Sequence, residues 1–163
     1  DLTYIIINNF IYGLTNSQTS PTTPQGMWTV TMSRGNIDPT FDACKLVEAA
    51  GASFVARETM IDPKRLERSL VKAFEHKGFS FVEVFSNCHI NLGRKNKMAT
   101  AMANLEWIDE ISISKTKFDM LDESEKIGKF PTGVLKHDEN ALEYCEAYEK
   151  VKEAHKNKTM VEL

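Results

Sequence analysis

Two helix–strand units follow one another in the middle of the chain, and they limit the fold more than any other feature. The pairs Asp38-Pro39 and Asp62-Pro63 each place an N-cap residue before a proline at the first helical position. Gly51 and Gly78 can end the two helices. A short apolar strand follows each helix, over residues 53–57 and 79–85. This alternation predicts an α/β fold with a mainly parallel sheet flanked by helices.

The chain begins with an apolar, β-branched run over residues 2–8, which is typical of a buried central strand. Such a strand needs neighbours on both sides, so we expect the chain to be a fragment of a larger domain. Residues 9–36 are rich in Thr, Ser, Gly, Gln and Pro and predict a long loop. A disordered linker is the alternative. Several large apolar side chains argue against it: Phe10, Ile11, Tyr12, Leu14, Met27 and Trp28.

The second half of the chain carries weaker signals. We expect a helix over about residues 97–109 and a polar, irregular stretch over residues 112–138. Ala141, Tyr144, Cys145, Tyr148 and Val151 mark an amphipathic C-terminal helix that packs on the domain or on a partner subunit. The predicted division is therefore residues 1–111, which carry the fold, and residues 112–163, an irregular segment plus this helix.

Composition excludes several classes of protein. The formal net charge of −3 gives no reason to expect nucleic acid as a partner. The longest apolar run, residues 4–7, is far shorter than the roughly 20 residues of a membrane-spanning helix. Cys44, Cys88 and Cys145 are an odd number without disulfide spacing, so reduced thiols in a cytoplasmic protein fit best, although one could ligate a metal or cluster.

Chemistry is expected where the first strand ends, because ligands of parallel α/β sheets bind beyond the carboxyl ends of the strands. An Asn side-chain oxygen and a backbone carbonyl two residues later are hard oxygen ligands of the kind that Mg²⁺ prefers. A dense set of hydroxyls follows and could receive a diphosphate: Thr15, Ser17, Thr19, Ser20, Thr22 and Thr23. By itself, Asn-Asn after a strand is most often only a turn.

The run Asn-Asn-Phe-Ile-Tyr-Gly-Leu-Thr-Asn-Ser-Gln-Thr-Ser-Pro-Thr-Thr-Pro at residues 8–24 resembles the second half of a known cofactor motif. It is similar to the thiamine diphosphate motif of 2-oxoacid:ferredoxin oxidoreductase β subunits. The resemblance continues through residues 49–57 and 76–88 and covers about the first 100 residues. It implies the C-terminal half of a thiamine diphosphate-binding fold. The motif's first half, a Gly-Asp-Gly whose aspartate is a third metal ligand, does not occur in this sequence.

The resemblance also implies roles for individual residues. The Asn9 side chain and the Ile11 carbonyl would ligate Mg²⁺, which in turn holds the cofactor diphosphate. Gly13, Leu14 and Thr15 would line the cofactor. The substrate-facing residues would be Asn16 and Ser17, which depart from the family's common Lys or Gly at the first position and Gly at the second. No catalytic acid or base is expected in this chain.

Cys88 follows the predicted strand over residues 79–85, where the family commonly has the last ligand of a [4Fe–4S] cluster after Ser-Pro. Here Asn87 replaces the proline, and a buried structural cysteine is the alternative. Such clusters take four thiolates, so the chain cannot hold one alone. Arg94, Lys95 and Lys97 are either solvated charges or a contact for coenzyme A or an acidic ferredoxin.

The implied activity is oxidative decarboxylation of a 2-oxoacid, with 2-oxoglutarate favoured, to an acyl-CoA. Electrons would pass through iron–sulfur clusters to ferredoxin or flavodoxin. The implied partners are an α subunit and further small subunits, with no nucleic acid and no membrane. Two alternatives stay open: a different thiamine diphosphate decarboxylase or synthase without the cluster, and a catalytically silent α/β binding or assembly module.

Overall fold

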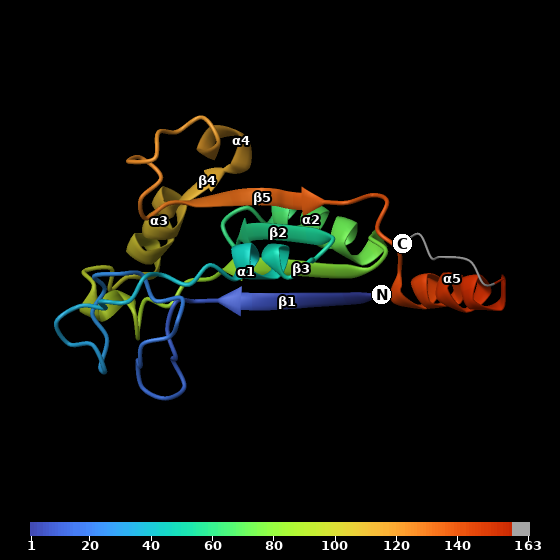
Figure 1. Cartoon of the computed structure of the whole chain (residues 1–163). Coiled ribbons are helices and arrows are strands. Elements are labelled where there is room, and N and C mark those ends of the chain that lie inside the picture. Colours follow the sequence, from blue (N-terminus) through green and yellow to red (C-terminus); the bar gives the residue numbers. More distant parts are fainter. Residues whose placement is uncertain (158–163) are drawn as a thin grey trace.

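The computed structural model describes residues 1–157, and a five-stranded sheet forms its centre (Figure 1). Across the sheet the strands lie in the order β1 (Leu2–Asn8), β3 (Phe79–Phe85), β2 (Phe54–Thr59), β5 (Phe130–His137) and β4 (Ser112–Ser114). The first three strands are parallel, whereas β5 runs antiparallel to β2. The predicted α/β fold with a mainly parallel sheet is therefore confirmed.

Helices cover both faces of this sheet. The described helices are α1 (Ala43–Ala49), α2 (Pro63–Glu75), α3 (Ala101–Ile111), α4 (Lys115–Phe118) and α5 (Tyr144–Asn157), with a 3-10 turn η1 (Gly93–Lys95). Of these, α1 and α2 pack on opposite faces of the sheet. Neighbouring residues of a strand point to opposite faces. Val55 accordingly packs in the cluster on the α1 side, and Ala56 packs in the cluster on the α2 side. Each fully buried side chain of valine size contributes ~1.5–3 kcal/mol, so β2 and β3 anchor the fold.

The position of β1 differs from the prediction. Among the described strands it pairs only with β3, so it lies at an edge rather than in the centre. Leu2 and Ile7 are 61% and 66% exposed, because no other strand lies on its outer side. The apolar pattern correctly predicted a strand, but within this chain that strand is not buried.

Helix α1 starts later than the sequence predicts. Its N-cap is Asp42, whose carboxylate accepts a hydrogen bond from the Lys45 N–H, and not Asp38. The second Asp-Pro pair behaves as predicted, because Asp62 caps α2 through the Arg65 N–H. Helix α3 also starts later than expected, after Thr100, whose hydroxyl caps the Ala103 N–H.

Residues 112–138 are only partly irregular. They contain β4, α4 and β5, and β5 completes the central sheet through its pairing with β2. Residues 112–137 therefore belong to the same sheet as residues 1–111. Helix α5 lies apart from the sheet, beyond the end where β1 begins (Figure 1).

The long segment between β1 and α1 is a loop, as predicted, and it contains no helix. It lies next to the loop after β3, at the end of the sheet opposite the N-terminus and α5 (Figure 1). In the described part of the chain no helix is long and apolar enough to cross a bilayer.

Candidate functional site

A tight turn at the end of β1 brings the two predicted metal ligands together. Asn9 is half-buried, and its Oδ1 atom accepts a hydrogen bond from the Ile11 N–H at 3.3 Å. Ile11 is only 5% exposed, yet its carbonyl oxygen accepts no hydrogen bond from any residue that the structure describes. A buried carbonyl without a partner costs free energy unless another group satisfies it.

Asn9 and Ile11 line the same cavity, which has a volume of about 510 Å³. Binding sites for small molecules usually measure roughly 300–1,000 Å³ and combine apolar walls with a few polar groups. The rest of the wall fits that description: Tyr4, Ile6, Ile7, Asn8, Tyr12, Ser20, Pro21, Thr22, Phe41, Ala43 and Glu83. The Asn9 side chain and the Ile11 carbonyl each supply a hard oxygen of the kind that Mg²⁺ prefers.

The other predicted cofactor residues lie farther along the same loop and outside that cavity. The Tyr12 N–H donates to the Gln18 carbonyl, and this pairing closes a small loop with Leu14 fully exposed at its tip. Thr15 and Asn16 are exposed as well, whereas Ser17 is buried.

Two residues of this tip have left-handed backbones, Asn16 with φ +71° and Ser17 with φ +70°. Such angles favour glycine, and asparagine tolerates them better than serine does. This gives a physical reason why the family commonly has glycine at the position of Ser17.

Most of the hydroxyl groups in this loop form hydrogen bonds within the protein that stabilise the loop. Thr23 Oγ1 donates to the Phe10 carbonyl at 2.6 Å, and Thr22 Oγ1 donates to Asn8 Oδ1 at 2.9 Å. Ser17 Oγ donates to Asn91 Oδ1 at 3.0 Å. Within the described residues, the Thr15 hydroxyl has no such partner and remains the member of the set most open to a ligand.

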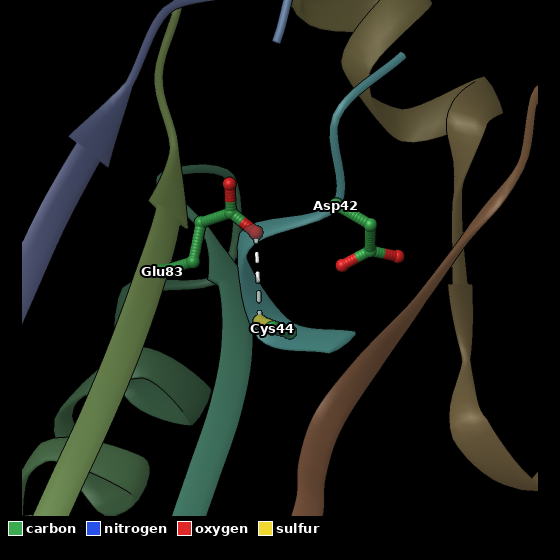
Figure 2. Close-up of side chains that lie close together, drawn as sticks. All are labelled: Asp42, Cys44 and Glu83. Atoms are coloured by element: carbon green, nitrogen blue, oxygen red, sulfur yellow. Dashed lines mark hydrogen bonds between the residues drawn. The ribbon is translucent and has the colours of Figure 1, made fainter. Parts of the chain in front are cut away.

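Sequence reasoning missed a buried polar cluster behind the turn, on the α1 side of the sheet. Figure 2 shows Asp42 and Cys44 from the start of α1 facing Glu83 of β3, with the Cys44 thiol donating to Glu83 at 3.5 Å. Ligand atoms of these three residues lie within 4.8 Å of one another, a spacing that could suit a metal ion.

The Arg57 guanidinium already serves as the cation of this cluster. Its Nε donates to Glu83 Oε2 at 2.8 Å, and its Nη2 forms an ion pair with Asp42. Burial and the neighbouring carboxylates raise the pKa of the Cys44 thiol, so Cys44 remains protonated and donates a hydrogen bond. The cluster is therefore an internal ion network rather than a metal centre.

Cys88 lies in the loop after β3, beside the Asn9 turn. Asn8 and Phe85, the last residues of β1 and β3, are register partners. The loop that contains Asn9 and the loop that contains Cys88 therefore leave neighbouring strands at the same end of the sheet. Cys88 is half-buried, and its N–H donates to Asn104 Oδ1 at 2.8 Å. Asn91 joins the two loops, since its Nδ2 donates to the Gly13 carbonyl at 3.2 Å.

The Cys88 loop is tightly packed. The Cys88 carbonyl accepts hydrogen bonds from the N–H groups of Leu92 and Gly93. A Cβ atom at Gly93 would lie 2.1 Å from the Met98 carbonyl oxygen, so this position requires glycine. Cys88 also contacts the apolar cluster around Phe10 and Leu92, as the structural alternative predicts. Of the other thiols, Cys44 is buried and Cys145 is exposed.

Comparison with known proteins decides which family has this site. A family profile described as "Thiamine pyrophosphate enzyme, C-terminal TPP binding domain" matches residues 1–84. The chain belongs to the thiamine pyrophosphate enzymes. The match covers β1, the turn with Asn9 and Ile11, and most of β3.

Among the thiamine pyrophosphate enzymes, the chain resembles 2-oxoglutarate synthase subunit KorB. It is 43% identical to that protein of Methanothermobacter marburgensis over 133 residues, which are 82% of this chain and 47% of the relative. It is 36% identical to the one of Archaeoglobus fulgidus over 154 residues, which are 93% of this chain and 53% of the relative. The chain thus spans about half the length of these curated relatives.

The fold is also similar to a solved structure described as 2-oxoglutarate:ferredoxin oxidoreductase from Magnetococcus marinus with 2-oxoglutarate, coenzyme A and succinyl-CoA bound. The TM-score is 0.71 at 22% identity, and the match covers 99% of this chain and 54% of that one. The predicted resemblance to the 2-oxoacid:ferredoxin oxidoreductase β subunits and the thiamine diphosphate-binding fold are both confirmed.

Proposed function

We propose that this chain forms part of the thiamine diphosphate site in the β subunit of a 2-oxoglutarate:ferredoxin oxidoreductase. One observation carries the proposal: Asn9 and Ile11, whose carbonyl accepts no hydrogen bond from the described residues, both line one cavity beyond the carboxyl end of β1. That is where ligands of parallel α/β sheets bind. The family match over residues 1–84 supports the same assignment.

In the proposed site the chain's own groups hold the cofactor through its metal. The oxygen atoms of Asn9 and Ile11 ligate Mg²⁺, and Gly13, Leu14 and Thr15 line the cofactor. When bound, the cofactor supplies the carbanion and electron-sink chemistry that breaks the bond to the carboxylate.

Asn16 and Ser17 are placed toward the 2-oxoacid in this proposal. Both lie next to Thr15 on the same loop, and Ser17 is fixed by its bond to Asn91. 2-Oxoglutarate is favoured because the relatives at 43% and 36% identity are 2-oxoglutarate synthase subunits. The rest of the assembly would comprise an α subunit, further small subunits, coenzyme A and a ferredoxin or flavodoxin acceptor, in a cytoplasmic complex.

The function can be tested on the assembled complex that contains the full subunit. We expect 2-oxoglutarate to reduce ferredoxin or a viologen dye only when coenzyme A, thiamine diphosphate and Mg²⁺ are all present. Carbon dioxide release without reduction of an acceptor would instead identify a non-oxidative thiamine diphosphate enzyme. If calorimetry detects no thiamine diphosphate binding, the complex is a silent module and the proposal fails.

Cys88 is proposed as one ligand of a [4Fe–4S] cluster beside the cofactor. Its loop lies against the Asn9 loop through Asn91, which would place a cluster near the reaction. We expect Cys88→Ala to remove most of the iron and sulfide of that cluster, because the cluster takes four thiolates. Acceptor reduction should fall at least ~100-fold, while thiamine diphosphate binding stays intact.

Iron and sulfide analysis, together with electron paramagnetic resonance of the reduced complex, measures this outcome. Cys145→Ala is the matched control, since Cys145 is exposed on α5 and should leave the cluster unchanged. A full cluster signal in Cys88→Ala would make Cys88 a packing residue only.

A further inference from the structure

We propose that Asn8 and Glu83 are positioning residues that set the geometry of the metal-binding turn. Neither residue would touch the metal or the cofactor, and each would act through the turn that holds the Asn9 side chain and the Ile11 carbonyl. The inference rests on the proposed function, because it assumes that these two oxygens bind Mg²⁺.

Three hydrogen bonds hold the Asn8 amide within the protein. Its Nδ2 donates to Glu83 Oε1 at 2.8 Å. Its Oδ1 accepts hydrogen bonds from the Phe10 N–H and from Thr22 Oγ1, both at 2.9 Å. Asn8 is only 7% exposed, and both acceptor positions of its oxygen are used, so it is unavailable as a metal ligand.

The hydrogen bond from the Phe10 N–H matters because Phe10 has a left-handed backbone, with φ +64°. A bulky residue adopts this angle only when its surroundings impose it. Here the Asn8 oxygen holds the Phe10 N–H, and Thr23 Oγ1 donates to the Phe10 carbonyl at 2.6 Å. The Phe10 ring packs on Phe85 and Trp107, with centroids 4.7 and 5.1 Å away.

The angle at Phe10 determines where its two neighbours point. Asn9 precedes Phe10 and Ile11 follows it, so the two proposed ligand oxygens change their relative position if Phe10 relaxes to a common backbone angle. Asn8 is therefore one of the groups that fix the relative position of these two oxygens in the turn, whose residues Asn9 and Ile11 line the same cavity.

Glu83 is itself rigidly held. It is 1% exposed, and its Oε2 accepts hydrogen bonds from Arg57 Nε at 2.8 Å and from the Cys44 thiol at 3.5 Å. The Arg57 guanidinium is anchored in turn by Asp42 and lies 5.4 Å from the centre of the Phe85 ring. A continuous set of buried contacts thus connects α1 and β3 with the turn.

The proposal makes a specific prediction about metal preference. Mg²⁺ requires near-ideal octahedral geometry, whereas Ca²⁺ accepts variable coordination. A turn that has lost its support should therefore lose affinity with Mg²⁺ more than with Ca²⁺. A general loss of stability would weaken binding with both metals equally.

The experiment uses Asn8→Ala in the assembled complex after removal of its thiamine diphosphate and metal. The dissociation constant of thiamine diphosphate is measured by calorimetry with saturating Mg²⁺ and again with saturating Ca²⁺. With Mg²⁺ it should rise ~10-fold or more, as for other residues that orient metal ligands. With Ca²⁺ the rise should stay below ~3-fold, because that ion tolerates displaced ligands.

Thr22→Val keeps the proposal testable if Asn8→Ala does not fold. It removes one of the two donors to Asn8 Oδ1 and should shift the metal preference in the same direction by a smaller factor. Thr31→Val is the matched control, because the Thr31 hydroxyl is exposed and bonds with Thr19 rather than Asn8. We expect it to bind like the unaltered protein with either metal.

Equal losses with Mg²⁺ and Ca²⁺, or no loss in either variant, would overturn the positioning role while leaving the proposed function intact. If the unaltered complex binds no thiamine diphosphate with either metal, the proposed function and this inference both fail.

Discussion

Asn9→Ala is expected to abolish the metal-dependent binding of thiamine diphosphate. The substitution deletes the side-chain oxygen proposed as a Mg²⁺ ligand and leaves the Ile11 N–H without its partner at 3.3 Å. Changes to residues that merely orient ligands already cost ~10–100-fold in metal affinity, so loss of a ligand should cost ~100-fold or more. Calorimetric titration of thiamine diphosphate into the metal-loaded complex measures the loss.

A matched control for Asn9→Ala is Asn140→Ala. Asn140 is exposed in the segment between β5 and α5, at the opposite end of the sheet from the cavity. We expect it to bind the cofactor as the unaltered protein does. If Asn9→Ala retained its affinity to within ~3-fold, the metal could not depend on this oxygen, and the proposed site would be wrong.

The two Asp-Pro pairs show that a local sequence signal predicts the start of a helix only where tertiary contacts agree with it. Both have the same start signal, yet only Asp62 begins a helix at its own position. At the first pair, the Asn36 side chain accepts from the Asp38 N–H and donates to the Asp38 carbonyl. The Phe41 N–H then donates to the Pro21 carbonyl, so the helix starts only at Asp42. These contacts are made by residues of the long loop, and the local sequence around Asp38 does not predict them.

The missed strand β5 has a related cause. Its sequence Phe-Pro-Thr-Gly-Val-Leu-Lys-His contains a proline and a glycine and lacks clean alternation, both of which argue against a strand. It forms because β2 offers an unpaired edge next to it, and β5 pairs there antiparallel. Tertiary pairing of this kind is not visible in a single segment.

The site itself was predictable only in part. The motif after β1 predicts Asn9 and Ile11 as metal ligands, and that role stays a prediction. The buried network behind them was missed, although the sequence contained a signal for it. Arg57 and Glu83 are charged residues that lie next to apolar residues within their strands. A charge on a buried strand must find an opposite charge or hydrogen-bond partners, which predicts a pair. What could not be predicted is that β1 and β3 are neighbours, which brings Asn8 to the same network.

Glu83→Ala is expected to have the largest effect on stability of any single substitution in this network. It leaves Arg57 buried at 1% exposure without one of its two carboxylate partners and leaves Asn8 Nδ2 without its acceptor. Removing one partner of a buried ion pair costs ~3–5 kcal/mol, because the remaining charge stays out of water uncompensated. Urea unfolding of the full subunit, followed by circular dichroism, measures the difference.

Two further variants test whether the loss of stability comes from breaking the buried Arg57–Glu83 ion pair or from removing any carboxylate. Asp119→Ala breaks the exposed Lys115–Asp119 pair on α4 and should change the free energy of unfolding by less than ~0.5 kcal/mol. Adding Arg57→Met to Glu83→Ala should recover part of the loss, because it removes the charge that the first substitution left unpaired. The opposite result would be a double variant with a lower free energy of unfolding than Glu83→Ala alone. In that case Arg57 still contributes to stability without Glu83, so it is stabilised mainly by Asp42 and the aromatic rings. Since Asn8 depends on Glu83 for its orientation, that result would also move the support of the metal-binding turn from the ion network to the threonine hydroxyls of the loop.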